Sequence, residues 1–136
     1  MGKRSTGRKL AMQALYQCHM RGVSTSQVLE EFLTDADYPD ITKAWAVELA
    51  GKAWEKHAEL DTLIEKYSEN WELHRINPVD LSVMRLALYE MRFTDTAPSV
   101  VINEAIELVK KFSDEDSPKF VNGILGNYVK KECLPV

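Results

Sequence analysis

The sequence contains no long hydrophobic run and very little cysteine. Its apolar stretches are short and interrupted by charges, so none approaches the ~18 apolar residues of a membrane-spanning helix. The basic N-terminal segment lacks the apolar block that follows in a secretory signal peptide. The two cysteines, Cys18 and Cys133, lie at opposite ends of the chain, and neither is at a metal-ligand spacing from a histidine. Unpaired thiols suit a reducing compartment, so we expect a cytoplasmic protein without membrane contact.

Signatures of catalysis are also scarce. No glycine-rich loop precedes a helix with the lysine of a phosphate-binding site. The histidines His19, His57 and His74 have no paired spacing, and no Ser/His/Asp or Cys/His set follows from their order. The acidic run at residues 114–116 is typical of a solvated loop. We therefore expect no enzymatic activity, no catalytic residues, no metal site and no cofactor.

The charges are distributed unevenly along the chain. The formal net charge is −4, which by itself argues against nucleic acid as a partner. However, all five basic residues before the first acidic residue, Glu30, are unopposed, and the remainder has 12 basic and 21 acidic residues. A basic arm on an acidic body is typical of proteins that bind phosphates. The alternative is a solvated tail without function. The arm consists of Lys3, Arg4, Arg8 and Lys9.

Apolar residues recur at helical spacing through the whole chain. The pattern predicts a first helix that ends before Gly22, a short helix near Ser26, and a long stretch from Thr42 that Asp61 divides in two. Later helices begin at prolines, which are favoured in the first helical turn. The prediction is an all-α fold of about seven helices. The polar region 70–77 separates two small bundles, about residues 1–70 and 71–136, which we expect to form one compact unit because each half is marginal alone.

The stretch SPKFVNGILGNYV, residues 117–129, is ambiguous. Asn122-Gly123 between apolar residues is a strong signal for a β-hairpin turn. The apolar positions nevertheless follow helical rather than alternating spacing, so we predict a helix. Gly123 then has a cost of about 1 kcal/mol relative to alanine. We expect Gly123 to permit close helix packing and Asn122 to make a structural hydrogen bond.

Two aromatic residues lie beside basic residues. Tyr16 is on the flank of the first helix, which also carries Arg8 and Lys9, and Phe120 follows Lys119. An aromatic ring with a neighbouring cation is suited to single-stranded RNA, because bases stack on the ring and the cation neutralises phosphate. Packing inside the fold is the alternative for both rings. We assign three other aromatic residues to the core: Trp45, Trp54 and Phe112.

Three stretches together carry a resemblance to a known family. They are RKLAMQALYQ at 8–17, VDLSVMRLALYEM at 79–91, and VVINEAIELVKKFSDEDSPKFVNGIL at 100–125. The chain resembles the NusB family of bacterial transcription antitermination factors over essentially its whole length. The resemblance implies a fold of two packed three-helix bundles and binding of boxA RNA, a single-stranded element of ribosomal RNA leaders. It also implies a protein partner, the ribosomal protein NusE, and an RNA polymerase assembly that suppresses termination. No catalysis is implied.

The resemblance also suggests which residues bind RNA. The basic arm and the tyrosine of QALY correspond to family positions, as do two acids, Asp80 and Asp116. We expect these acids to accept hydrogen bonds from base edges or to orient the arm, since carboxylates repel phosphates. The arm has Ser5, Thr6 and Gly7 where many members are richer in arginine. We therefore expect the arm to bind RNA less tightly than in those members, with the same role. The complete set of expected RNA-binding residues is Lys3, Arg4, Arg8, Lys9, Tyr16, Asp80, Asp116, Lys119 and Phe120.

Three alternatives remain open at this point. The chain could be a free-standing relative of the NusB-like accessory domain found on some rRNA methyltransferases, although no methyltransferase sequence accompanies it here. It could be a small enzyme that uses its acids, which the missing nucleophile and metal signatures disfavour. It could also form a homodimer whose interface covers the RNA site.

Overall fold

The computed structural model describes residues 3–23, 25–33, 37–69 and 71–133, with the side chains of Lys3, Phe32 and Leu33 outside the description. The described residues contain seven α-helices and no β-strand, which confirms the predicted all-α fold, including a helix rather than a hairpin near the C-terminus. The helices are α1 (Lys3–Arg21), α2 (Thr25–Leu33), α3 (Asp40–Glu55), α4 (His57–Tyr67), α5 (Pro78–Phe93), α6 (Pro98–Phe112) and α7 (Ser117–Tyr128). A 3-10 turn, η1 (Leu73–Arg75), precedes α5, and a π-helical turn, η2 (Val129–Cys133), follows α7.

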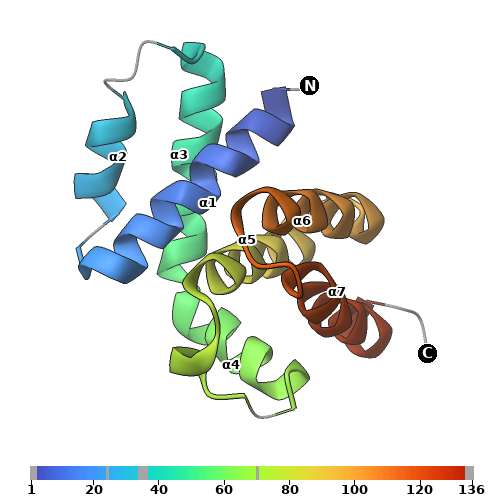
Figure 1. Cartoon of the computed structure of the whole chain (residues 1–136). Helices are drawn as coiled ribbons and strands as arrows, with labels where there is room; N and C mark the ends of the chain where they lie inside the picture. The colour runs from blue at the N-terminus through green and yellow to red at the C-terminus, as the bar shows by residue number, and fades with distance from the viewer. Residues whose placement is uncertain (1–2, 24, 34–36, 70, 134–136) are drawn as a thin grey trace.

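Helix α5 is the centre of the molecule. Every residue from Asp80 to Met91 is buried, because α1, α4, α6 and α7 all pack against α5. Helix α1 packs mainly against α3 and α5 and also reaches α6, so it connects the two halves of the fold (Figure 1). The two groups of helices therefore share one continuous core.

The division near residue 70 stays a prediction, and α4 is the helix whose packing bears on it. Helix α4, which ends at Tyr67, packs against α5 and α7 much more than against α3 (Figure 1). We therefore infer an N-terminal group of α1, α2 and α3 and a C-terminal group of α4 to α7, with the division near Lys56. Sequence composition predicts the division at the polar stretch 70–77, which follows α4.

The helix boundaries follow from local chemistry. At the start of α5, the side-chain oxygen of Asn77 accepts a hydrogen bond of 2.8 Å from the Val79 amide, and Pro78 occupies the first helical position. The prediction that Asp61 separates two helices is wrong. The break is at Lys56, and Asp61 lies inside α4, where its carboxylate accepts two hydrogen bonds from the Arg85 guanidinium at 2.7 and 2.9 Å. Asp61 therefore joins α4 to α5.

The expected role of Gly123 is also wrong. A Cβ atom at Gly123 would meet no described atom within 4 Å, so close packing does not require glycine there. Asn122 is exposed, and its side chain makes no hydrogen bond within the described part of the chain. Nothing in the structure explains this Asn-Gly pair. Close packing instead requires Gly7, because a Cβ atom there would overlap the ring of Trp45. Helix α1 thus packs against the Trp45 ring of α3 at Gly7.

The C-terminal turn is held to the C-terminal group by a polar cluster. Glu132 of η2 accepts a short hydrogen bond from the Tyr67 hydroxyl and pairs with Arg92 at 3.1 Å. Arg92 also pairs with Glu59 of α4 at 2.8 Å. Burial, and then the bond to Glu132, raise the pKa of Tyr67 to about 12. These contacts join α4, α5 and the end of the described chain.

Candidate nucleic-acid interface

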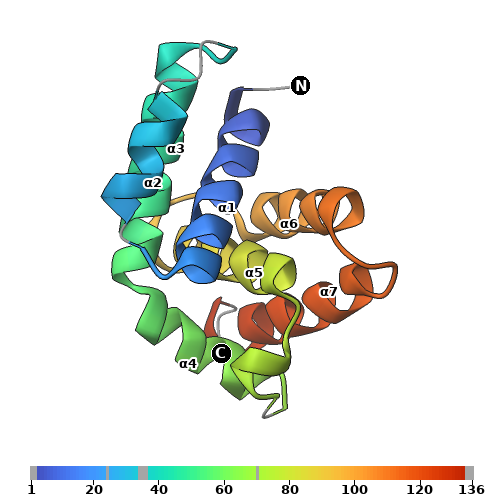
Figure 2. The ribbon, with the colours of Figure 1, turned by 60° about the vertical axis from the view of Figure 1, so that its left-hand side comes forward.

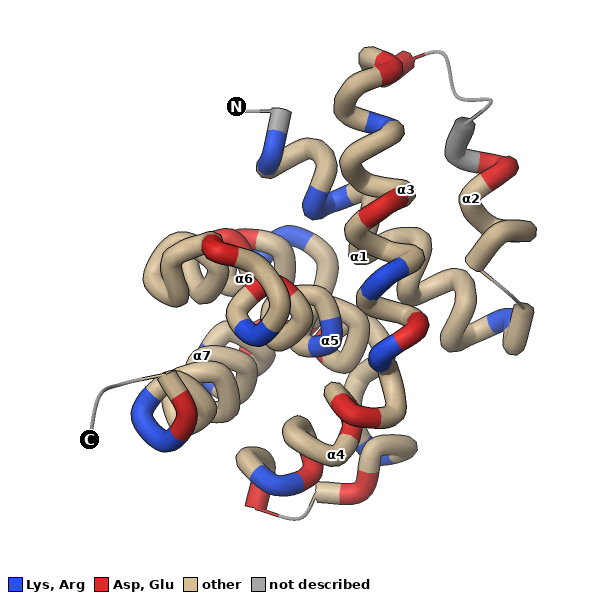
Figure 3. The backbone as a smooth tube through the Cα atoms, turned by 180° about the vertical axis from the view of Figure 1, so that it is seen from behind, with Lys and Arg blue, Asp and Glu red and all other residues tan. Residues whose placement is uncertain are grey.

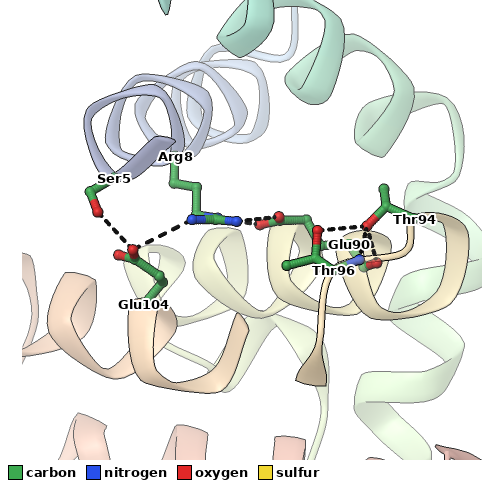
Figure 4. Close-up of polar contacts among 6 residues, drawn as sticks. All are labelled: Ser5, Arg8, Glu90, Thr94, Thr96 and Glu104. Carbon is green, nitrogen blue, oxygen red and sulfur yellow. Dashed lines mark hydrogen bonds and ion pairs between the residues drawn. The ribbon is translucent and has the colours of Figure 1, made fainter. Parts of the chain in front are cut away.

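Arg8, which the sequence placed in the basic arm, lies inside the molecule. Its side chain is about 7% exposed and donates two hydrogen bonds to the Glu90 carboxylate, at 2.8 and 2.9 Å (Figure 4). A third nitrogen lies 3.4 Å from Glu104, which also accepts a hydrogen bond of 2.6 Å from Ser5. Burial by itself disfavours the charge, but the two carboxylates outweigh it and raise the pKa of Arg8. Its charge is therefore neutralised within the fold.

The surroundings of this ion pair fix the position of α1. Glu90 lies in the last turn of α5, and that turn is closed by the Thr94 hydroxyl, which donates to the Glu90 carbonyl at 2.6 Å (Figure 4). On the opposite side, the guanidinium groups of Arg4 and Arg8 lie 4.3 and 5.5 Å from the ring centroid of Trp45. The N-terminal half of α1 is therefore held between α3 on one side and α5 and α6 on the other.

The remaining basic residues of α1 differ in exposure. Arg4 is exposed, and Lys9 is half-buried with its ammonium donating to the Tyr38 hydroxyl at 3.1 Å. The side chain of Lys3 lies outside the described part. Tyr16 is half-buried farther along the helix. Figure 3 shows basic positions but no acidic ones on α1, whereas α2 to α6 each carry acidic positions. The surface cations of α1 are therefore not opposed along their own helix.

A groove lies between α1 and α6, with a volume of about 680 Å³. We call it the lysine groove, because Lys9 lines it from α1 and Lys110 and Lys111 line it from α6. Phe112 also lines this groove and is 38% exposed, so its assignment to the core is wrong. Trp45 and Trp54, by contrast, are half-buried against the core, as expected. The complete lining is Ser5, Thr6, Lys9, Val100, Asn103, Glu104, Glu107, Leu108, Lys110, Lys111 and Phe112.

Asp80 is buried and faces the α6–α7 loop. Its two oxygens accept hydrogen bonds from the hydroxyls of Ser113, at 2.6 Å, and Ser117, at 2.8 Å. Burial raises the pKa of Asp80, and the two serine hydroxyls oppose that rise. The expectation that Asp80 orients the basic arm therefore needs correction, because it orients the α6–α7 loop. A direct contact between Asp80 and RNA stays a prediction.

A second hollow, of about 220 Å³, is lined by Asp80 and by residues of the α6–α7 loop. We call it the aromatic hollow, because Trp71 and Phe120 form its wall, with ring centroids 5.6 Å apart and planes at 62°. The guanidinium of Arg75 lies 5.9 Å from the Trp71 ring centroid. Asp116 lines the hollow and is exposed, as is the neighbouring Lys119. The complete lining is Trp71, Arg75, Ile76, Asn77, Asp80, Asp114, Asp116, Ser117 and Phe120.

The structure brings the predicted residues together in two groups. One group surrounds the N-terminal half of α1 and the lysine groove, and the other surrounds the aromatic hollow. Figure 2 shows the α6–α7 loop projecting from the molecule, with α1 and α6 above it and the α4–α5 connection below. Tyr16 lines neither hollow.

Sequence reasoning missed four residues of this surface. Trp71 and Arg75 belong to the aromatic hollow, and Lys110 and Lys111 belong to the lysine groove. An aromatic residue inside a polar stretch, with an arginine four positions later, was a usable signal for the first pair. Their proximity to Phe120, however, depends on how η1 meets α7, which local sequence does not reveal.

The described residues offer neither a membrane span nor a metal site. No described helix combines the length and the apolar character that crossing a bilayer requires. No group of three or more His, Cys, Asp or Glu side chains converges, within the described ranges, in a way that could hold a metal ion.

Comparison with known proteins agrees with the fold and the sequence pattern. Residues 5–130 match the model of the NusB family. The chain is 40% identical over 136 residues to the transcription antitermination protein NusB of Leptospira biflexa, covering 99% of this chain and 97% of that protein. The structure of NusB from T. maritima is 37% identical, with a TM-score of 0.86 over 96% of this chain and 92% of that one. A crystal structure of antitermination factors NusB and NusE in complex with dsRNA contains a chain 28% identical, with a TM-score of 0.87, covering 96% and 98%. The chain belongs to the NusB family.

Proposed function

We propose that this protein is an RNA-binding transcription antitermination factor. It binds a boxA-type single-stranded RNA together with the ribosomal protein NusE, joins an RNA polymerase antitermination assembly in the cytoplasm, and promotes transcription of ribosomal RNA. The observation that carries the proposal is a groove lined by lysines between α1 and α6, together with an aromatic hollow beside the α6–α7 loop, in a chain of the NusB family. The relative solved with NusE and dsRNA supports NusE and RNA as partners; that the RNA is single-stranded and of the boxA type is the proposal.

The chemistry of this surface suits single-stranded RNA. Arg4 and the lysines of the groove supply positive charge for phosphates, and Trp71 and Phe120 supply faces for bases. The acids on the same surface cannot favour phosphates, but they can accept hydrogen bonds from base edges. A net charge of −4 is compatible with this role, because Arg4 and Lys9 lie on the helix that borders the lysine groove, which Glu104 and Glu107 also line.

Titration of a labelled boxA-type RNA from about 50 to about 200 mM salt, with and without NusE, tests the proposal. We expect NusE to raise the affinity. Each phosphate contact with a single strand contributes about 0.7 to the slope of log affinity against log salt. Arg4→Ala and Lys9→Ala should therefore each reduce the slope by about that amount if each side chain contacts one phosphate.

Arg21 provides a matched control for these variants. It is a basic residue of the same helix, but it lies at the opposite end and pairs with Glu31 at 3.0 Å. Arg21→Ala should leave the slope unchanged. RNA binding that is insensitive to salt and equally insensitive to all three substitutions would refute a role for α1.

NusE dependence separates the proposal from the alternatives. An accessory domain of the methyltransferase-linked type would bind RNA without any gain from NusE. A homodimer that covers the RNA site would show, in sedimentation, a dimer that dissociates when RNA is added. We propose the NusE-dependent factor because relatives of nearly equal length carry that antitermination name.

A further inference from the structure

Two aromatic residues on the α3 side of the protein contact the cations in the N-terminal half of α1. The ring centroid of Trp45, in α3, lies 4.3 Å from the Arg4 guanidinium. The ring centroid of Tyr38, two residues before α3, lies 5.2 Å from the Lys9 ammonium, which also donates to the Tyr38 hydroxyl at 3.1 Å. Both distances are within the ~6 Å over which an aromatic ring attracts a cation. We call Trp45 and Tyr38 the aromatic pair.

The rings of the aromatic pair are fixed by the fold rather than by the cations. Both rings are half-buried and pack against the hydrophobic core. The Trp45 ring also fills the space that the missing side chain of Gly7 leaves on α1. Gly7 lies next to Arg8, whose guanidinium is anchored to Glu90 at 2.8 and 2.9 Å. The rings therefore form a rigid support beside α1.

The two supported cations keep hydrogen-bond donors for a ligand. Arg4 is exposed, and its guanidinium makes no hydrogen bond or ion pair with the described residues. A guanidinium that stacks through its face leaves its N–H edge free, and that edge can bind a phosphate with two hydrogen bonds. The ammonium of Lys9 has three donors, of which Tyr38 accepts one.

Aromatic contact restricts a cation without removing its charge. A carboxylate does both, as Glu90 does for Arg8, and that cation is then lost for phosphates. An aromatic ring has no net charge, so Arg4 and Lys9 stay attractive to an anion while their side chains are held. Long basic side chains lose much rotamer freedom when a ligand fixes them. The cost of ordering one such side chain corresponds to about 2- to 10-fold in affinity, and the aromatic pair removes part of that cost.

We propose that Trp45 and Tyr38 are positioning residues, which hold Arg4 and Lys9 in place for the phosphates of an RNA strand without contacting the RNA themselves. This inference rests on the proposed function, because it explains how the cations of α1 are prepared for that RNA. It gives Trp45, which packs against the core, a second role. It also assigns part of RNA binding to α3 and to the segment before it.

A double-mutant cycle tests the role of Trp45. The affinity of the NusE complex for a boxA-type RNA is measured for the wild type, Trp45→Leu, Arg4→Ala and the double variant. We expect Trp45→Leu to weaken binding by about 2- to 10-fold in the wild type and to have no further effect once Arg4 is alanine. Because Trp45 carries no charge, Trp45→Leu should leave the salt slope unchanged, whereas Arg4→Ala should reduce it by about 0.7.

The variant Trp45→Phe separates positioning from packing. Phenylalanine and leucine are both smaller than tryptophan, so both variants leave space beside Gly7 and should melt below the wild type. Phenylalanine keeps an aromatic face for Arg4, so Trp45→Phe should retain most of the RNA affinity that Trp45→Leu loses. A loss of affinity that is the same in both variants and follows their Tm would overturn the positioning role.

Trp54 supplies the matched control. It is another half-buried tryptophan of α3, and the Arg85 guanidinium lies 5.5 Å from its ring centroid. Arg85, however, is paired with Asp61 at 2.7 Å and is not part of the basic arm. The effects of Trp54→Leu and Arg4→Ala on RNA affinity should therefore be additive. Coupling of Trp54 to Arg4 as strong as that of Trp45 would overturn the inference.

A second cycle, with Tyr38→Leu and Lys9→Ala, tests the other half of the aromatic pair. We expect coupling in the same range, about 2- to 10-fold, because the Lys9 ammonium loses both its ring and its hydroxyl contact. RNA binding in which both cycles are additive overturns the aromatic pair alone, and additivity in one cycle removes that residue from it. A wild-type protein that binds no RNA with or without NusE overturns the proposed function as well.

Discussion

Removing Arg8 should destabilise the fold before it affects RNA binding. The variant Arg8→Ala leaves the Glu90 carboxylate, whose side chain is 2% exposed, without its two hydrogen-bond donors. Breaking one side of a buried ion pair typically costs about 3–5 kcal/mol, because an uncompensated charge remains in the interior. The free energy of unfolding of an ordinary domain is about 5–15 kcal/mol, so the loss is a large fraction of the total.

The same figure predicts a large change in thermal stability. For a chain of 136 residues, 1 kcal/mol corresponds to a shift of roughly 4 °C in Tm. Arg8→Ala should therefore melt about 12–20 °C below the wild type, as measured by circular dichroism. The double variant Arg8→Met with Glu90→Leu removes both charges, and should recover most of the loss because apolar replacements of buried pairs are often neutral.

RNA binding distinguishes a structural arginine from a phosphate contact. Because the charge of Arg8 is neutralised by Glu90, Arg8→Ala should not reduce the salt slope at temperatures where the variant is folded. Arg4→Ala is the matched comparison, since Arg4 is exposed and lies one turn earlier in the same helix. A variant Arg8→Ala with unchanged Tm and a slope smaller by about 0.7 would refute the buried ion pair as the role of Arg8.

Three further predictions concern stability. Gly7→Ala should lower the free energy of unfolding by about 1–3 kcal/mol in urea titrations, because the added Cβ atom overlaps the Trp45 ring. The control Gly123→Ala should raise the free energy of unfolding by about 0.5–1 kcal/mol. A Gly7→Ala variant more stable than the wild type would contradict the contact. The pKa of Asp80 is raised in the folded state, so its contribution to stability is complete below the ordinary pKa of an aspartate and is lost as pH rises through the folded-state pKa. The difference in free energy of unfolding between wild type and Asp80→Asn should therefore fall over that pH range. A difference that does not change with pH would contradict this. In absorbance titrations Tyr67 should ionise near pH 12, and this step should be missing in Tyr67→Phe. The contribution of Tyr67 to stability should be complete below pH 10 and lost as pH rises through about 12.

Helix positions could be predicted because their causes are local. Proline after a capping residue, as at Asn77-Pro78, and apolar residues at helical spacing act within one or two turns. The same rules resolved residues 117–129 as a helix despite Asn122-Gly123. The position of the break between α3 and α4 could not be predicted in this way. Asp61 looked like a residue that starts a helix, but its carboxylate accepts a hydrogen bond from Arg85 on another helix.

Roles of charged residues could be predicted only in part. The sequence showed that the first helix is basic, but not that Glu90, 82 positions away, neutralises Arg8. Whether a charged side chain is buried depends on its tertiary partners. A buried arginine therefore cannot be distinguished in the sequence from an exposed one. Phe112 shows the opposite error, since it follows the apolar spacing of α6 and yet lines the lysine groove.

The two hollows are positioned by the same helix. Glu90 of α5 holds α1 through Arg8, and Asp80 of α5 holds the α6–α7 loop through Ser113 and Ser117. These two carboxylates are ten residues apart, or about 15 Å along a helix that rises about 1.5 Å per residue. Because α5 is buried along its length, it has little freedom to bend, and the spacing between lysine groove and aromatic hollow is fixed before any ligand binds. Preformed spacing lowers the ordering cost of binding, so a ligand that spans both hollows would bind best if it already matches that distance.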